Sequence, residues 1–79
     1  MNLQIITPEK MVYSGQAQSV TLPGTLGLFE VLENHAPLIS SLSKGKINYV
    51  LPSGEQKEIE AASGGFVEVN QNFVSVCID

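Results

Sequence analysis

The sequence predicts an all-β protein built from short antiparallel strands that pack as a sandwich or barrel. Apolar and polar residues alternate in short runs, which is the period of a strand with one buried face. Seven glycines and four prolines divide the chain into pieces that are too short for ordinary helices. No window of eleven residues carries apolar side chains at helical spacing without a glycine or proline in it. We therefore expect no helix.

The alternating runs follow one another along most of the chain. Val20 and Leu22 fall on one face of their run, and Thr21 falls on the other. Val74 and Val76 alternate in the same way with Phe73, Ser75 and Cys77 in the last run. Clusters of turn residues separate the runs at the spacing typical of small β domains. We expect strands at residues 3–7, 11–13, 16–22, 46–51, 55–62, 66–69 and 73–78.

Three turns can be placed between these strands. Pro52, Ser53 and Gly54 join two runs, because proline suits the second position of a turn and glycine accepts positive φ. Residues 70–72, Asn-Gln-Asn, join the last two runs, since asparagine tolerates the left-handed conformation. The pair at 64–65, Gly-Gly, is followed by neither a Lys-Ser/Thr pair nor a helix, so we interpret it as a tight turn or bulge rather than a phosphate loop.

Residues 24–44 differ from the rest of the chain. They contain apolar side chains without clean alternation, flanking glycines and the only histidine, His35. Function in small β domains often lies in long connecting segments. We therefore expect the functional surface here.

The composition excludes several classes of function. The 79 residues form one domain at most, residues 1–79, with a net charge of −4. All four basic residues are lysines, so nucleic acid is an unsuitable ligand. No apolar run is long enough to span a membrane, and we expect neither membrane insertion nor a secretory signal. Only 15% of the residues are charged, which suggests that a partner covers part of the surface.

The residues give little indication of a catalytic function. His35 is the only histidine and fits no nucleophile elbow, and with Cys77 it supplies too few ligands for a metal. Glu58 and Glu60 lie on one strand face, as expected of a solvated surface. We expect no catalytic residue, metal, cofactor or small-molecule substrate. Cys77 is interpreted as a buried or half-buried thiol, and His35 as a locally hydrogen-bonded organiser of its turn, an exposed interface residue, or both.

The order of several motifs resembles the epsilon subunit of F-type ATP synthase. The motifs are SVTLPG at 19–24, HAPL at 35–38 and SGGFVEV at 63–69. The resemblance covers essentially the whole chain and corresponds to the family's N-terminal domain, so it implies a sandwich of about ten strands in two sheets. The family's C-terminal helical hairpin has no counterpart in these 79 residues.

The resemblance implies a non-catalytic subunit of the central stalk that binds the gamma subunit and the ring of c subunits. Such a subunit couples rotation of the ring to ATP synthesis elsewhere, at the cytoplasmic face of a bacterial inner membrane. By position, Thr7, His35 and Ser40 match family residues near gamma. The loop around Leu28 matches the part that faces the ring. The expected interface residues are Thr7, Leu28, Phe29, Glu30, Val31, His35, Pro37, Leu38 and Ser40.

Four residues depart from the family pattern. Leu28 replaces a common acidic residue, Glu30 replaces a glycine, and the pair Glu33-Asn34 replaces proline-glycine before the histidine. Asparagine can keep the left-handed turn that glycine would make. The alternative interpretation is a free-standing β-sandwich adaptor or ligand-binding module without a rotary role. A lipoyl-type carrier is weaker, because the turn at 52–54 has no lysine.

Overall fold

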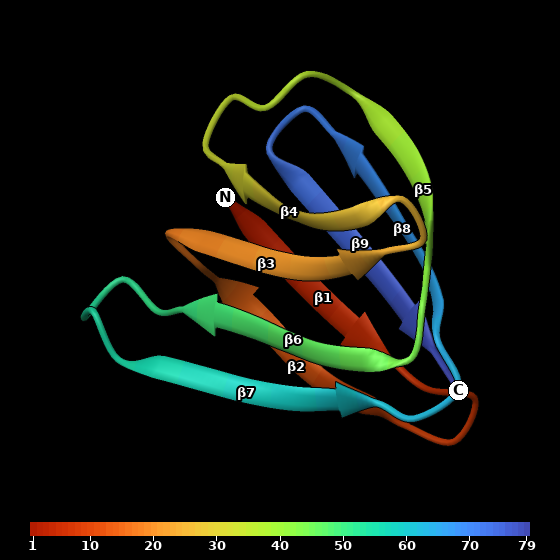
Figure 1. Ribbon diagram of the computed structural model, residues 1–79. Coiled ribbons are helices and arrows are strands. Elements are labelled where there is room, and N and C mark those ends of the chain that lie inside the picture. The colour runs from red at the N-terminus through yellow and green to blue at the C-terminus, as the bar shows by residue number, and fades with distance from the viewer.

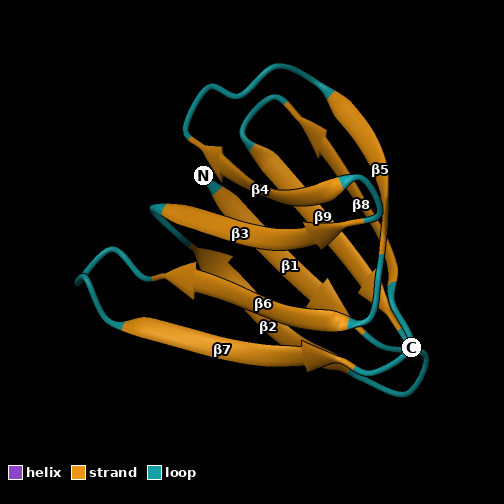
Figure 2. Cartoon of the chain, in the orientation of Figure 1, coloured by secondary structure: helices purple, strands orange, loops and turns teal.

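The computed structural model describes all residues 1–79 and consists of nine strands without a helix (Figures 1 and 2). The all-β prediction is confirmed, with nine strands in place of about ten. No helix long and apolar enough to cross a membrane is present. The strands are β1 (Asn2–Ile6), β2 (Met11–Gln16), β3 (Ser19–Gly24), β4 (Gly27–Leu32), β5 (Leu38–Leu42), β6 (Gly45–Val50), β7 (Gln56–Ala61), β8 (Gly65–Asn70) and β9 (Phe73–Ile78).

The strands form two facing layers that are joined along one side. One layer has the order β2-β1-β9-β8-β5, and the other has the order β4-β3-β6-β7 (Figure 1). The layers are connected by hydrogen bonding where Leu42 of β5 pairs with Gly24 of β3. The two expected sheets are therefore one continuous sheet that folds over on itself.

One pairing differs from the antiparallel pattern that the sequence predicts. The first strand, β1, runs parallel to the last strand, β9, with Asn2 opposite Phe73 and Ile6 opposite Cys77. All other pairings are antiparallel. Alternation cannot reveal this, because it reports which face is buried and not the direction of the neighbouring strand.

The core fills the space between the two layers. Sixteen buried apolar residues contribute to it, and Val20, Leu22, Val74 and Val76 are completely buried. These are the residues whose alternation predicts an inward face, so that prediction is confirmed. Tyr49 lies in the same core, and its ring packs on Tyr13 with centroids 4.8 Å apart.

Strand boundaries differ most from the prediction between residues 11 and 44. Strand β2 continues through the Ser14-Gly15 pair, and β3 includes Pro23 and Gly24. The region without clean alternation contains two full strands, β4 and β5. Leu28, Leu32 and Ile39 point outward from these strands and are well exposed, which hides the period of two.

The predicted turns form where glycine and asparagine occur. Gly54 has a φ of 93°. Gln71 and Asn72 both have positive φ in the two-residue loop between β8 and β9, the geometry that matches the twist of a hairpin. Gly64 and Gly65 also have positive φ, and a Cβ there would overlap the carbonyl oxygens of Leu42 and Cys77. The Gly-Gly pair is thus required for the strands to approach each other closely.

Candidate partner-binding surface

Charge is distributed very unequally between the two layers. The strands of the five-stranded layer carry a single charged residue, Glu68. The strands of the other layer carry Glu30, Lys46, Lys57, Glu58 and Glu60. Since a face that always meets water gains solubility from charge, the five-stranded layer is the better candidate for a covered surface.

We call the outer side of the five-stranded layer the low-charge face. Strand register places its residues in three rows that run across β5, β8, β9, β1 and β2. The rows are Asn70, Phe73, Asn2 and Gln16; Ile39, Glu68, Ser75, Gln4 and Ser14; and Ser41, Phe66, Cys77, Ile6 and Met11.

Large apolar side chains on this face are open to solvent. Ile39 is 76% exposed, Phe66 52%, Met11 50% and Phe73 44%. Half-buried Cys77 lies between Phe66 and Ile6 in the third row, which confirms the expected burial of the thiol. Aromatic and methionine side chains on a surface with few charges are the composition of a protein–protein interface.

A groove of about 620 Å³ lies at one end of this face. Ile6, Thr7, Pro8, Phe66 and Cys77 are among its lining residues. The Thr7 hydroxyl is engaged in its own turn, because Oγ1 accepts the Lys10 amide N–H at 3.2 Å and donates to the Lys10 carbonyl oxygen at 3.2 Å. Thr7 thus shapes the β1–β2 turn beside the groove.

The β3–β4 hairpin presents a second apolar surface. Leu26 at its tip is fully exposed and Leu28 is 75% exposed. Phe29 turns inward and packs partly on the core, and Glu30 is exposed. Val31 is completely buried. Its expected place at a partner interface is therefore wrong, because a side chain inside the sandwich offers no surface to another protein.

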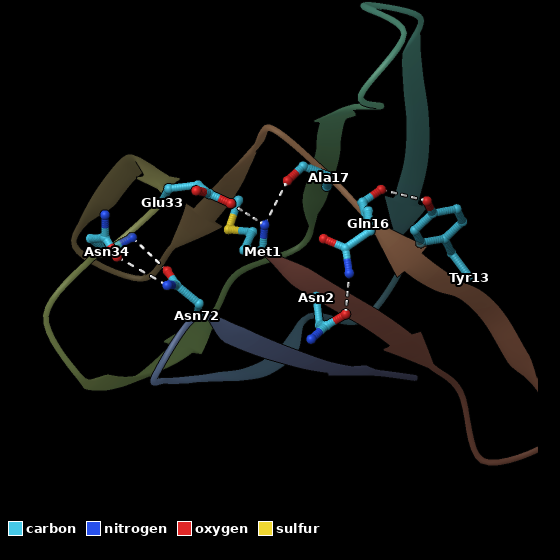
Figure 3. Close-up of polar contacts among 8 residues, drawn as sticks. All are labelled: Met1, Asn2, Tyr13, Gln16, Ala17, Glu33, Asn34 and Asn72. Atoms are coloured by element: carbon cyan, nitrogen blue, oxygen red, sulfur yellow. Dashed lines mark hydrogen bonds and ion pairs between the residues drawn. The ribbon is translucent and has the colours of Figure 1, made fainter.

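Two polar residues of the β4–β5 loop, Glu33 and Asn34, hold it against other parts of the chain (Figure 3). Asn34 exchanges hydrogen bonds with Asn72, and Glu33 pairs at 2.5 Å with the ammonium group of Met1. That ammonium group also donates to the Ala17 carbonyl oxygen at 3.2 Å. His35 is half-buried, and its Nδ1 lies 2.7 Å from the Ala36 carbonyl oxygen. The local hydrogen bond expected for His35 is therefore present, next to exposed Pro37.

The nine expected interface residues do not form one cluster. Leu28 and Glu30 are exposed on β4, and Leu38 and Ser40 are half-buried and point to the inner side of β5. Thr7 follows the end of β1, whereas His35 is next to the Asn34–Asn72 contact, near the start of β1. These residues lie at opposite ends of the five-stranded layer.

The expected interface residues omit several exposed apolar side chains, although Leu26 and Ile39 lie within residues 24–44, where the functional surface was expected. Ile39, Phe66, Phe73 and Leu26 were not among the expected interface residues. The signal for two of them was present, because Phe66 and Phe73 occupy outward positions in runs whose valines point inward. Apolar residues at outward positions indicate a surface that another molecule covers when several of them gather on one face.

His, Cys, Asp and Glu side chains nowhere form a group of three that could hold a metal. Burial raises the pKa of the Tyr49 hydroxyl, and the neighbouring Tyr13 adds to this while Lys57 opposes it. Tyr49 belongs to the core, so this shift concerns stability.

Known proteins resemble this chain in sequence over its whole length. The family model described as "ATP synthase, Delta/Epsilon chain, beta-sandwich domain" matches residues 1–79. The ATP synthase epsilon chain of Leptospira borgpetersenii is 39% identical over 79 residues, which are all of this chain and 61% of that protein. The epsilon chain of Chlorobaculum tepidum is 44% identical over 70 residues, 89% of this chain and 78% of that protein. This chain spans about three fifths of the length of several curated relatives.

Solved structures share the fold at low sequence identity. A chain of the Euglena gracilis mitochondrial ATP synthase structure, described as OSCP/F1/c-ring, superposes with a TM-score of 0.90 at 19% identity. The match covers 96% of this chain and 48% of the other. A chain of the Tetrahymena thermophila central stalk and c-ring structure gives a TM-score of 0.81 at 13% identity, covering 98% of this chain and 61% of the other.

Proposed function

Because the chain belongs to the family of ATP synthase delta/epsilon chain β-sandwich domains, we propose that it is a non-catalytic subunit of the central stalk of an F-type ATP synthase. In this role it binds the gamma subunit and the c-ring and couples their rotation to ATP synthesis at sites on other subunits. It belongs to the membrane-associated complex, on the cytoplasmic face of a bacterial inner membrane.

The low-charge face is the observation that carries this proposal. Ile39, Phe66 and Phe73 on this face supply apolar contact area, and the neutral polar side chains between them can hydrogen-bond across an interface. We assign this face to gamma. The groove beside Thr7 extends the same surface at one end.

The β3–β4 hairpin is our candidate for the c-ring contact. Leu26 projects from the two-residue loop and Leu28 from the start of β4 beside it, so the tip is both apolar and anchored by the paired strands. Leu28 stands where relatives commonly have an acidic residue, which makes this contact apolar in the present chain.

A subunit that transmits torque needs rigidity more than reactive groups. Sixteen core residues lock two hydrogen-bonded layers together, and the chain contains 48 backbone hydrogen bonds. Force applied at the hairpin reaches the opposite layer through this close-packed interior, which deforms little.

The experiment is a pull-down of the tagged chain from ATP synthase membranes, with gamma and c subunits detected in the eluate. We expect Phe66→Asp to reduce the recovery of gamma strongly, because it places a charge within the contact area. Asn48→Asp is the matched control, since Asn48 is exposed on the other layer. It should leave the recovery unchanged.

Two other outcomes would count against the proposal. If Phe66→Asp and the unmodified chain recover gamma equally, gamma does not bind the low-charge face. If the unmodified chain recovers neither gamma nor c subunits, the rotary role is wrong. A free-standing adaptor or ligand-binding module, the alternative interpretation, would give that second result.

A further inference from the structure

Glu68 is a single negative charge in the middle of the low-charge face. Strand register places it between Ile39 on β5 and Ser75 on β9, and its side chain is exposed. The chain's three ion pairs use other acids, namely Glu33, Glu55 and Glu58. Glu68 therefore has no cationic partner within the chain.

The carboxylate lies at a shallow depression of about 540 Å³ on the same face. Every other residue that lines the depression is uncharged. Asn2, Asn70 and Gln71 offer amide groups, Ser75 offers a hydroxyl, and Phe73 offers an aromatic ring. The depression thus combines one negative charge, several neutral hydrogen-bonding groups and a ring.

A partner that covers this face removes water from the Glu68 carboxylate. Burying an ionised carboxylate without a counter-charge is strongly unfavourable. No residue of this chain lining the depression can compensate, because none of them is basic. The compensating charge must therefore come from the partner.

We propose that the partner seated on the low-charge face inserts an arginine side chain into this depression and pairs it with Glu68. The inference rests on the proposed function and deepens it. Arginine suits the site better than lysine, since its planar guanidinium has five N–H donors for the carboxylate and the amide oxygens nearby. Its flat face can also stack on the ring of Phe73.

The same charge disfavours a second copy of this chain as the occupant. A two-fold contact through the depression would place the two Glu68 carboxylates against each other with no cation between them. Like charges in such a contact oppose association. Glu68 thus selects a basic partner and discourages self-association through this face.

The test measures the affinity of the 79-residue chain for purified gamma subunit. Glu68→Gln keeps the size of the side chain and removes only the charge. We expect it to weaken binding by about 30-fold or more, the usual consequence of truncating one member of a desolvated charge pair. Glu60→Gln is the matched control, because Glu60 is an exposed acid on β7 in the other layer and in none of the three ion pairs. It should bind within about twofold of the unmodified chain.

Two further measurements separate a charge pair from a structural role. Raising the salt concentration should lower the affinity of the unmodified chain for gamma more steeply than that of the Glu68→Gln variant. The melting temperatures of the unmodified chain and the variant should agree. Equal affinity of Glu68→Gln and the unmodified chain overturns the inference, and so does a loss of affinity accompanied by a lower melting temperature. If the unmodified chain itself fails to bind gamma, the proposed function is what has failed.

Discussion

Asn34 and Asn72 hold together two turns that are far apart in the sequence. The Asn34 N–H donates to Asn72 Oδ1 at 2.5 Å, and Asn72 Nδ2 donates to Asn34 Oδ1 at 3.0 Å. Both residues are left-handed, with φ of 62° and 61°. The Asn2 N–H also donates to the Asn72 carbonyl oxygen at 2.8 Å. This contact fixes the β4–β5 loop, and with it His35, against the end of the five-stranded layer.

Replacing Asn72 should separate the role of its backbone from that of its side chain. Asn72→Gly keeps the left-handed turn and loses the side-chain hydrogen bonds, which should cost about 1 kcal/mol. Asn72→Ala also strains the backbone and should cost about 1 kcal/mol more. Urea denaturation measures both values. In a double-mutant cycle with Asn34→Gly, which removes the Asn34 side chain and keeps its N–H, a coupling energy near zero would show that the bond from Asn72 Nδ2 to Asn34 Oδ1 contributes nothing.

The Gly64-Gly65 pair should tolerate no side chain. Gly65→Ala forces a methyl group into the Cys77 carbonyl oxygen at a φ of 154°, so we expect a loss of more than about 3 kcal/mol or a failure to fold. Gly54→Ala is the control, because a Cβ there meets no atom within 4 Å. It should cost only about 1 kcal/mol for the positive φ. Thermal denaturation followed by circular dichroism compares the stabilities of the two variants. Equal losses of stability would contradict the steric argument.

Val31 and Leu28 should respond in opposite ways to the same substitution. Val31→Asp places an unpaired charge in the core, which costs several kcal/mol and should unfold a domain of this size. Leu28→Asp changes an exposed side chain and should alter stability by less than about 0.5 kcal/mol. Dispersion of amide signals in NMR spectra distinguishes folded from unfolded chains. A well-folded Val31→Asp chain would mean that Val31 is not in the core.

Stability should fall at alkaline pH because of Tyr49. Burial raises the pKa of its hydroxyl in the folded state above the usual value of 10.0, so the folded state holds this proton more tightly. The resulting stabilisation is complete below pH 10 and is lost as the pH rises through the folded pKa. Urea denaturation between pH 8 and pH 11 should show a smaller loss for Tyr49→Phe. Parallel losses in the two chains would exclude this contribution.

The sequence predicted the fold well where one face of a strand is apolar and the other is not. Val20 and Leu22 mark an inward face because Ser19 and Thr21 beside them are polar, and Val74 and Val76 do so on either side of Ser75. The alternation of apolar and polar residues is absent from β4 and β5, because Leu28, Leu32 and Ile39 point outward and remove the contrast between the two faces of each strand. The parallel pairing of β1 with β9 depends on contacts between the ends of the chain, which a local pattern does not contain.

The functional surface was harder to predict than the fold. The resemblance to the epsilon family identified residues of β4 and of the β4–β5 loop as interface residues. Val31 is not one of them, because its side chain is buried in the core. The resemblance did not identify the low-charge face, which depends on which strands are neighbours. Phe66 and Ile39 lie on adjacent strands although they are far apart in the sequence, and only the strand order brings them together.

The position of β1 has a consequence for how the chain acquires its structure. This strand lies between β2 and β9, so one of its two edges stays open until β9 has left the ribosome. Residue 2 finds its partner only when residue 73 is available. Pairing over such sequence separations slows folding, and the exposed edge invites contacts with other chains in the interval. Early release of a shortened chain, lacking β9, would leave the backbone edge of β1 unpaired and open to pairing with other chains.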